Sequence, residues 1–242
     1  MNSGIESQNF NSPQPNKSKI RLLTFILSPL ITAAVFFIAA GTLNFPEGWI
    51  FNIWYTLLAW AVTYYLWKKD PALLRERSDF GSYKNQKGWD KIFVPIAVVS
   101  YFLWFFIMPI EICRLGWVTD VPIAVRVLGG LLLLISFVFL YRSVTDNTFL
   151  SPAVRIQEER KQKVITTGSY GFVRHPMYLG MAAIMLGAPL LMGSLLGLGL
   201  GIFITILFML RVPGEEKMLK EELDGYLEYT KKVKYRIFPF IW

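Results

Sequence analysis

The chain has 242 residues, of which 54% are apolar and 17% are charged, whereas an average soluble domain has roughly 25% charged residues. Its net charge of +8 comes from basic residues that flank long apolar runs, which the positive-inside rule explains better than nucleic-acid binding does. A single cysteine, Cys113, and a single histidine, His175, exclude an internal disulfide and a Cys-rich or His-rich metal site. Composition therefore predicts an all-α, polytopic membrane protein with no bound metal and no nucleic-acid partner.

The first part of the chain is predicted to hold a tail and four membrane spans. Residues 1–18 are rich in Asn, Ser, Gln and Pro and are expected to form a disordered cytosolic tail. Residues 19–141 form the four-span unit, with spans expected at Leu22–Ala40, Trp49–Trp67, Ile92–Ile110 and Pro122–Tyr141. In the polar loop between the second and third spans, the run Arg75-Glu76-Arg77 is interpreted as a solvated face.

Residues 142–242 form the second predicted unit, which begins with a long polar loop that ends at Arg174. The apolar segments Pro176–Leu191 and Leu195–Leu210 follow, and both are slightly shorter than the about 20 helical residues that a bilayer core requires. They are expected to form a tight helical hairpin that is tilted or partly re-entrant. Beyond it, an amphipathic helix is expected to lie on the membrane or fold over the site, with one face formed by Leu219, Leu223, Tyr226, Leu227 and Thr230.

Glycine spacing predicts close helix packing in this hairpin. Gly193, Gly197 and Gly201 recur every four residues, and small residues at that spacing let two helices approach closely. This stripe is interpreted as a packing surface rather than as a phosphate-binding loop.

The distribution of basic residues predicts six crossings with both chain ends in the cytosol. With that topology, every Lys and Arg except Arg114 and Arg126 falls in or beside a cytosolic segment. The loop 142–174 then faces the cytosol, and the expected location is the plasma or inner membrane. No internal repeat is visible, which argues against a repeat-built transporter.

The sequence around the single histidine predicts the start of a helix, with polar residues that could bind a ligand. Pro176 suits the first turn of a helix, which places His175 at the start and Tyr178 within the first turn. The free N–H groups of such a start favour a carboxylate ligand. In the alternative, structural interpretation, Arg174 reaches toward lipid headgroups, His175 caps the helix and Tyr178 anchors the interface. Composition alone favours this structural interpretation.

A second polar group stands where the last apolar segment ends. Arg211 and Glu215 are four residues apart, and a helix break predicted at Pro213-Gly214 would let them point into a pocket. The structural alternative is that Glu215 and Glu216 form the favourable acidic first turn of a following helix.

The combined pattern resembles the isoprenylcysteine carboxyl methyltransferase family, within the wider group of membrane phospholipid N-methyltransferases. It consists of G-S-Y-G-F-V-R-H-P-M-Y-L-G, then R-x-x-x-E-E, then a Leu/Tyr-rich tail that ends in K-K-V-K-Y-R-I-F-P-F-I. The resemblance covers the chain from the end of the fourth predicted span onward. The first three spans match the family only in general character.

This resemblance implies an integral membrane enzyme that uses S-adenosyl-L-methionine. Cofactor contacts are expected at Gln162, Lys163, Val164, Ile165, Tyr170, His175, Pro176, Met177, Tyr178 and Glu215. Arg155 aligns with a further contact, and Arg211 corresponds to an arginine implicated at the substrate. Arg211 and Glu215 are therefore the expected catalytic residues. Gln162 departs from the family pattern, in which a histidine stands at this position.

The expected acceptor is a lipophilic small molecule or a lipidated substrate that enters from the lipid bilayer. A prenylated cysteine carboxylate, a phosphatidylethanolamine-type amine and a small isoprenoid acid all stay open, as does the oligomeric state. One alternative function is a sterol-type membrane reductase that uses NADPH, which shares an R-H-P-x-Y-like turn but resembles the R-x-x-x-E-E segment less. The other is a non-enzymatic binding or transport protein, which charged residues deep in the spans would favour; such residues are almost absent.

Overall fold

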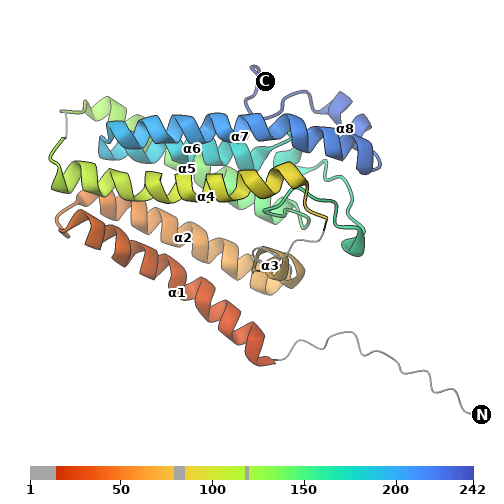
Figure 1. Cartoon of the computed structure of the whole chain (residues 1–242), viewed down its shortest axis with the longest axis horizontal. Coiled ribbons are helices and arrows are strands. Elements are labelled where there is room, and N and C mark those ends of the chain that lie inside the picture. Colours follow the sequence, from red (N-terminus) through yellow and green to blue (C-terminus); the bar gives the residue numbers. More distant parts are fainter. Residues whose placement is uncertain (1–14, 79–84, 118–119) are drawn as a thin grey trace, which may run out of the picture.

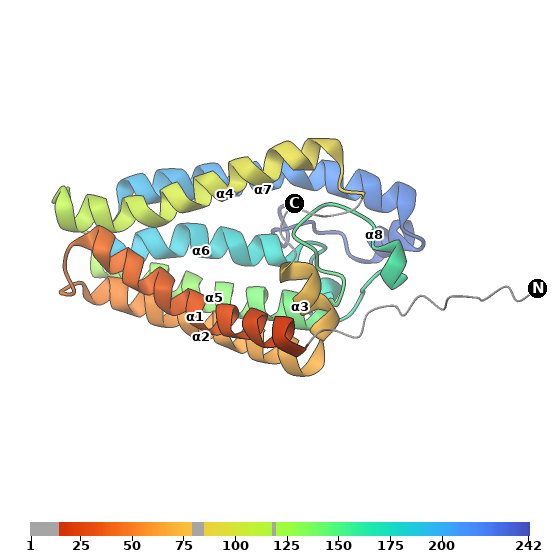
Figure 2. The same ribbon diagram turned by 60° about the horizontal axis from the view of Figure 1, so that its bottom comes forward.

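The computed structural model describes residues 15–78, 85–117 and 120–242, and within these ranges it is all-helical, as predicted. Long helices run side by side in an antiparallel bundle, and short helices and loops gather at one end (Figures 1 and 2). The α-helices are α1 (Pro15–Ala40), α2 (Pro46–Lys69), α3 (Pro71–Ser78), α4 (Gly88–Pro109), α5 (Ile123–Asp146), α6 (Pro176–Met192), α7 (Leu195–Glu222) and α8 (Tyr226–Lys232). A π-helical turn, Ile110–Arg114, and two 3₁₀ turns, Glu158–Arg160 and Gly168–Gly171, complete the elements.

Four segments are long and apolar enough to cross a membrane, which makes the chain an integral membrane protein. They are Leu22–Ala40 in α1, Gly88–Arg114, α5 and α7. Helix α6 is apolar but shorter, and α2 has enough length but is interrupted by polar side chains such as Asn52 and Thr63. Both run alongside the other four (Figure 2), and the count of six crossings stays a prediction.

The bounds of two predicted segments need correction. Helix α1 begins at Pro15, so residues 15–18 of the predicted disordered tail are helical, and residues 1–14 lie outside the described residues. Helix α7 continues from Leu195 to Glu222, so the break predicted at Pro213-Gly214 is wrong. Polar contacts of Arg211 and Glu216, on either side of this dipeptide, hold the helix in place despite the proline.

The core of the bundle is aromatic and lies where α1, α2 and α4 meet. Phe36, Phe51 and Trp104 are fully buried. Phe51 and Trp104 meet edge to face with ring centroids 6.1 Å apart, an arrangement that aromatic rings prefer. Trp104 also donates from its indole nitrogen to the carbonyl of Met185, at 3.2 Å. This bond ties α4 to α6 at mid-bundle depth.

The predicted packing role of the glycine stripe holds for two of its three members. A side chain at Gly201 would lie 2.0 Å from the Met185 carbonyl oxygen, and one at Gly197 would lie 2.5 Å from the Met108 side chain. Gly193 differs, because it ends α6 in a left-handed conformation with φ of 87°, which favours glycine at a helix C-terminus. The turn is further held by buried Glu111, which accepts hydrogen bonds from the Ser194 hydroxyl and the first N–H groups of α7.

We predict that Gly201→Ala destabilises the protein by about 1–3 kcal/mol, the usual range for overpacking a close contact. The matched control is Gly199→Ala in the same helix, where an added methyl group meets nothing within 4 Å. This control should be neutral or stabilising by about 0.5–1 kcal/mol, because alanine is the better helix former. Thermal unfolding in detergent measures both, and equal melting temperatures for the two variants would contradict the packing role.

Candidate active site

A cavity of about 570 Å³ lies at the end of the bundle where the loop after α5, the start of α6 and helix α8 come together. Its polar end is lined by the loop and by α8, and its apolar end runs between α4, α6 and α7. Tyr101, Met181, Met185, Ile204 and Phe208 line that apolar end. The cavity thus joins a polar compartment to a hydrocarbon-like one.

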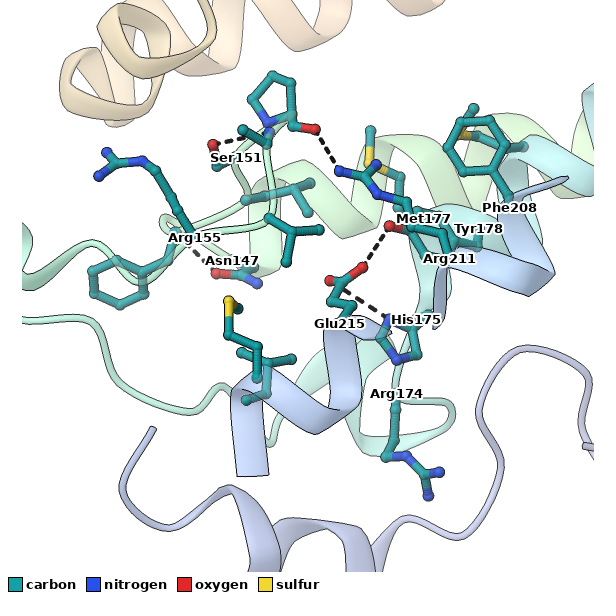
Figure 3. Close-up of a pocket in the computed structure, with 18 of the residues that line it drawn as sticks. Asn147, Ser151, Arg155, Arg174, His175, Met177, Tyr178, Phe208, Arg211 and Glu215 are labelled. Atoms are coloured by element: carbon teal, nitrogen blue, oxygen red, sulfur yellow. Dashed lines mark hydrogen bonds and ion pairs between the residues drawn. The ribbon is translucent and has the colours of Figure 1, made fainter. Parts of the chain in front are cut away.

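The structure brings nearly all of the predicted site residues to this one cavity. The residues that line it include Arg155, Gln162, Lys163, Val164, Ile165, Tyr170, His175, Met177, Tyr178, Arg211 and Glu215. Pro176 is the exception, since it is buried as the first residue of α6 and does not line the cavity. Figure 3 shows the Tyr178 hydroxyl directed toward the Glu215 carboxylate, while the Arg211 guanidinium group points toward the carbonyl of Pro152.

Glu215 is held by two aromatic side chains from the start of α6. The Tyr178 hydroxyl donates to Glu215 Oε2 at 2.6 Å, and His175 Nδ1 lies 3.9 Å from Glu215 Oε1. The two rings stack with centroids 5.4 Å apart and an interplanar angle of 5°. A carboxylate in this position has one firm hydrogen bond from a neutral phenol, so it keeps capacity for a cationic or donor ligand.

The neighbouring Glu216 has a different environment and a structural role. It is 2% exposed and lies within 2.6 Å of Arg174 Nε and 3.2 Å of Arg236 Nε. Arg174 is itself buried, which contradicts the interpretation that it reaches toward lipid headgroups. The pair costs less inside the protein than either charge alone would, and it ties α6, α7 and the C-terminal segment together.

The backbone amides of the histidine turn are largely occupied. The N–H groups of Arg174 and His175 donate to the carbonyls of Tyr235 and Arg236, at 2.9 and 2.8 Å. The N–H of Tyr178 donates to the His175 carbonyl at 3.0 Å. The expected carboxylate cradle of free N–H groups is therefore wrong for these residues, because the C-terminal segment uses them. The His175 side chain also makes no capping hydrogen bond.

Arg211 is clamped at one corner of its guanidinium group by a residue that the sequence did not single out. Its Nη2 lies 2.8 Å from Oδ1 of Asp90, which is fully buried in the first turn of α4. The same nitrogen donates to the Pro152 carbonyl at 2.9 Å, and the group lies over the Phe93 ring at 4.8 Å. Arg211 Nε is buried and has no hydrogen-bond partner among the described residues. The Nε–H donor of this cation therefore stays available to a ligand.

The polar loop is anchored by short helix α3. Arg75 is exposed, as predicted for the run at 75–77, but Glu76 is directed into the loop and corrects the prediction of a solvated face there. Glu76 Oε2 lies 2.9 Å from Arg155 Nη2, and its Oε1 accepts from the Ser151 hydroxyl at 2.8 Å. Arg155 also bonds Glu159 at 2.6 Å, and this hydrogen bond lowers the pKa of the Glu159 carboxyl. Gln162 accepts from the backbone N–H of Gln157 at 2.8 Å. These contacts give the loop wall a fixed shape.

Helix α8 covers the polar end of the cavity, which is one of the two placements predicted for the amphipathic segment. Leu227, which was predicted on its apolar face, is exposed instead. Tyr226 and Tyr229 are buried and pack with Val164, Leu219 and Leu223. Burial raises the pKa of both tyrosines and of Tyr170, so all three are neutral phenols. The pattern did not predict that α7 ends at Glu222 and that Gly225, with φ of 82°, starts a separate helix.

The described residues contain no group of three or more His, Cys, Asp or Glu side chains that could hold a metal ion. Asp90 and Tyr226 are the members that sequence reasoning missed as site residues. A signal existed in each case: an acidic residue between two basic ones at a helix start, and a tyrosine on the apolar face of an amphipathic segment.

Comparison with known proteins agrees with this geometry. Residues 124–224 match the model of the phospholipid methyltransferase family. Protein-S-isoprenylcysteine O-methyltransferase B of Arabidopsis thaliana is 25% identical over 127 residues, which cover 52% of this chain and 61% of that protein. Protein-S-isoprenylcysteine O-methyltransferase of Saccharomyces cerevisiae is 38% identical over 93 residues, 38% of each chain. The resemblance to the isoprenylcysteine carboxyl methyltransferase family is thereby confirmed.

These matches have a defined extent. The chain spans less than two thirds of the length of each of these two relatives. The family region, residues 124–224, contains the loop, the helical hairpin and both Arg211 and Glu215. Asp90 and α8 lie outside this region.

We predict that Asp90→Ala destabilises the protein by about 3–5 kcal/mol, because it leaves the buried Arg211 guanidinium without its counter-charge. The matched control is Glu222→Ala. Glu222 pairs with Lys87 between the same two helix ends, but the two side chains are 41% and 33% exposed. An exposed pair contributes less than about 1 kcal/mol. Thermal unfolding in detergent should give a lower melting temperature for Asp90→Ala than for Glu222→Ala. Equal losses of stability in the two variants would contradict the stabilising role of the Asp90–Arg211 pair.

Proposed function

We propose that the protein is an S-adenosylmethionine-dependent methyltransferase that acts on the carboxylate of a lipid-like acceptor. The observation that carries the proposal is the placement of Arg211 and Glu215 one turn apart on α7, facing one cavity. Arg211 offers a buried Nε donor that has no hydrogen-bond partner among the described residues, and Glu215 offers a carboxylate with a single hydrogen bond, from Tyr178. The cavity also joins a polar end to an apolar one.

The residues present fit the proposed cofactor. S-adenosylmethionine carries an ammonium group, a flat base and, on its sulfonium, the electrophilic methyl group that it supplies when bound. Glu215 would hold the ammonium group, because it is the cavity carboxylate without a full ion pair. Val164, Ile165 and Tyr170 provide an apolar and aromatic wall that suits the base. Arg155 and Arg174 are committed to Glu76 and Glu216, so their roles at the cavity are structural.

Arg211 favours a carboxylate acceptor over an amine. A guanidinium group is a donor only, so its unpartnered Nε requires a group that accepts hydrogen bonds. A carboxylate fits such a planar donor edge well, whereas a protonated amine has no lone pair to offer. Both relatives are named as O-methyltransferases, which agrees with an oxygen acceptor. An acceptor carboxylate is anionic already, so no residue has to act as a general base.

The apolar end of the cavity suits the hydrocarbon part of the acceptor. Met181, Met185 and Phe208 line it beside α4 residues such as Ala97 and Tyr101. Methionine and aromatic side chains adapt well to flexible apolar ligands. Arg211 would orient the carboxylate while these side chains hold the tail, and α8 would exclude water from the polar end.

The proposed orientation places the polar end of the cavity in the cytosol, in agreement with the basic residues of the loops and of the C-terminal segment. Six crossings, with both chain ends inside, bring soluble cofactor to this face and lipid-soluble acceptor from the membrane. We assign the protein to a plasma or inner membrane on the same basis.

We predict that Glu215→Gln weakens S-adenosylmethionine binding about tenfold to a hundredfold, the loss expected when a charge-assisted hydrogen bond becomes neutral. Gln keeps the shape of the side chain and can still accept from Tyr178. Glu221→Gln, on an exposed face of the same helix, is the control and should bind as the wild type does. Calorimetric titration of S-adenosylmethionine and S-adenosylhomocysteine into detergent-solubilised protein measures this. Unchanged affinity in the Glu215 variant would refute its role.

Binding of NADPH but of neither sulfur ligand, by folded wild type, would overturn the methyltransferase assignment.

We predict that Arg211→Lys lowers kcat/KM for a carboxylate acceptor at least tenfold and changes the cofactor Kd less than threefold. Lysine keeps the positive charge against Asp90 but loses the planar donor edge. Methyl transfer from labelled cofactor to farnesylated cysteine derivatives measures turnover, and titration measures Kd. Equal losses in both quantities would refute a specific role at the acceptor.

A further inference from the structure

Helix α8 contains two tyrosines that differ in the hydrogen bonding of their hydroxyl groups. Tyr226 and Tyr229 are 4% and 3% exposed, and their ring centroids are 5.5 Å apart. The Tyr229 hydroxyl donates to the backbone carbonyl of Tyr170 at 2.6 Å. The Tyr226 hydroxyl is buried and has no hydrogen-bond partner among the described residues. Both side chains line the cavity.

A buried hydroxyl group without a partner is costly. Its desolvation is worth about 1–3 kcal/mol in folded proteins, so such groups are rare unless a ligand or water satisfies them. The ring of Tyr226 packs with Val164, Leu219 and Leu223. These side chains offer no acceptor to its hydroxyl group. Tyr226 also lines the cavity, so a bound ligand is the group that could bring an acceptor to it.

The protonation state of Tyr226 defines the kind of ligand atom that it can meet. Burial raises the pKa of this phenol, and the nearby negative charges of Glu216 and Glu215 raise it further. The group therefore stays protonated near neutral pH and acts as a hydrogen-bond donor. Its partner must be an acceptor atom, such as a carboxylate oxygen, a ribose hydroxyl or a ring nitrogen.

From this contrast we infer that Tyr226 is a cofactor-binding residue and that its hydroxyl donates a hydrogen bond to S-adenosylmethionine. The inference rests on the proposed function for the identity of the ligand. It makes α8 more than a water-excluding cover, because Tyr226 gives the helix a directional contact with the bound molecule. Tyr229, by comparison, joins the same helix to the protein through the carbonyl of Tyr170.

The test compares Tyr226→Phe with Tyr229→Phe, two variants that each remove one hydroxyl group from neighbouring buried rings. Binding of S-adenosylhomocysteine to the full-length protein in detergent is measured by calorimetry, and the melting temperature is measured without ligand. Tyr226→Phe should weaken S-adenosylhomocysteine binding about fivefold to fiftyfold, since a ligand acceptor loses its donor, and should leave the ligand-free melting temperature unchanged or higher. Tyr229→Phe should lower the ligand-free melting temperature and change the Kd less than threefold.

A second titration locates the acceptor atom on the ligand. 5′-Methylthioadenosine has the nucleoside of the cofactor but lacks its amino-acid end. If Tyr226→Phe weakens this probe too, the bond goes to the nucleoside; if it weakens S-adenosylhomocysteine alone, the bond goes to the amino-acid carboxylate. Unchanged affinity of Tyr226→Phe for both probes would overturn the inference, as would the same loss of ligand-free stability as in Tyr229→Phe. Absence of binding to wild type would instead defeat the proposed function itself.

Discussion

Buried charges need partners, and this requirement fixes helix α7, on which the site depends. Arg211 meets Asp90 from α4, and Glu216 meets Arg174 from the start of α6. An unpaired charge at these depths would cost several kcal/mol, so the two contacts set the rotation and the depth of α7 against both neighbouring helices. Glu215 lies between them in the sequence. Its direction into the cavity follows from the two flanking pairs together with the hydrogen bond from Tyr178.

The same pairs explain where sequence reasoning succeeded and where it failed. The all-α fold follows from the apolar runs, and the convergence of His175, Tyr178 and Glu215 follows from a local motif and a family resemblance. Asp90 was not singled out, because an acidic residue in a first helical turn has a sufficient local explanation in the helix dipole. The expected break at Pro213 failed for a related reason, since partners far along the chain override a local preference. The sequence of one segment does not show which distant residue will form an ion pair with it.

Helix α8 shows a finer limit of the sequence pattern. Amphipathic spacing placed Tyr226 on the apolar face and predicted a helix that lies on the membrane or folds over the site. Spacing cannot show which hydroxyl group finds a hydrogen-bond partner, however. The Tyr229 hydroxyl reaches the carbonyl of Tyr170, whereas the Tyr226 hydroxyl has no partner among the described residues. Arg174 is a similar case, because its burial depends on Glu216 and on carbonyls of the C-terminal segment. The role of each polar side chain at this site depends on its tertiary hydrogen bonds, whereas the apolar faces of the helices can be predicted from the spacing of apolar residues.

The length of α7 accounts for the mixed character of the cavity. Its 28 residues correspond to about 42 Å of helix at 1.5 Å per residue, whereas the hydrocarbon core of a bilayer is about 30 Å thick. The turns that begin at Arg211 therefore reach the interface, where charged groups cost less than at the bilayer centre. Phe208 and Ile204, about one and two turns earlier, remain at apolar depth beside Met185 of α6. A continuous helix thus presents carboxylate and guanidinium groups at its interfacial end and hydrocarbon at its embedded end. A water-soluble ligand and a lipid-soluble one can meet along it without either leaving its own medium.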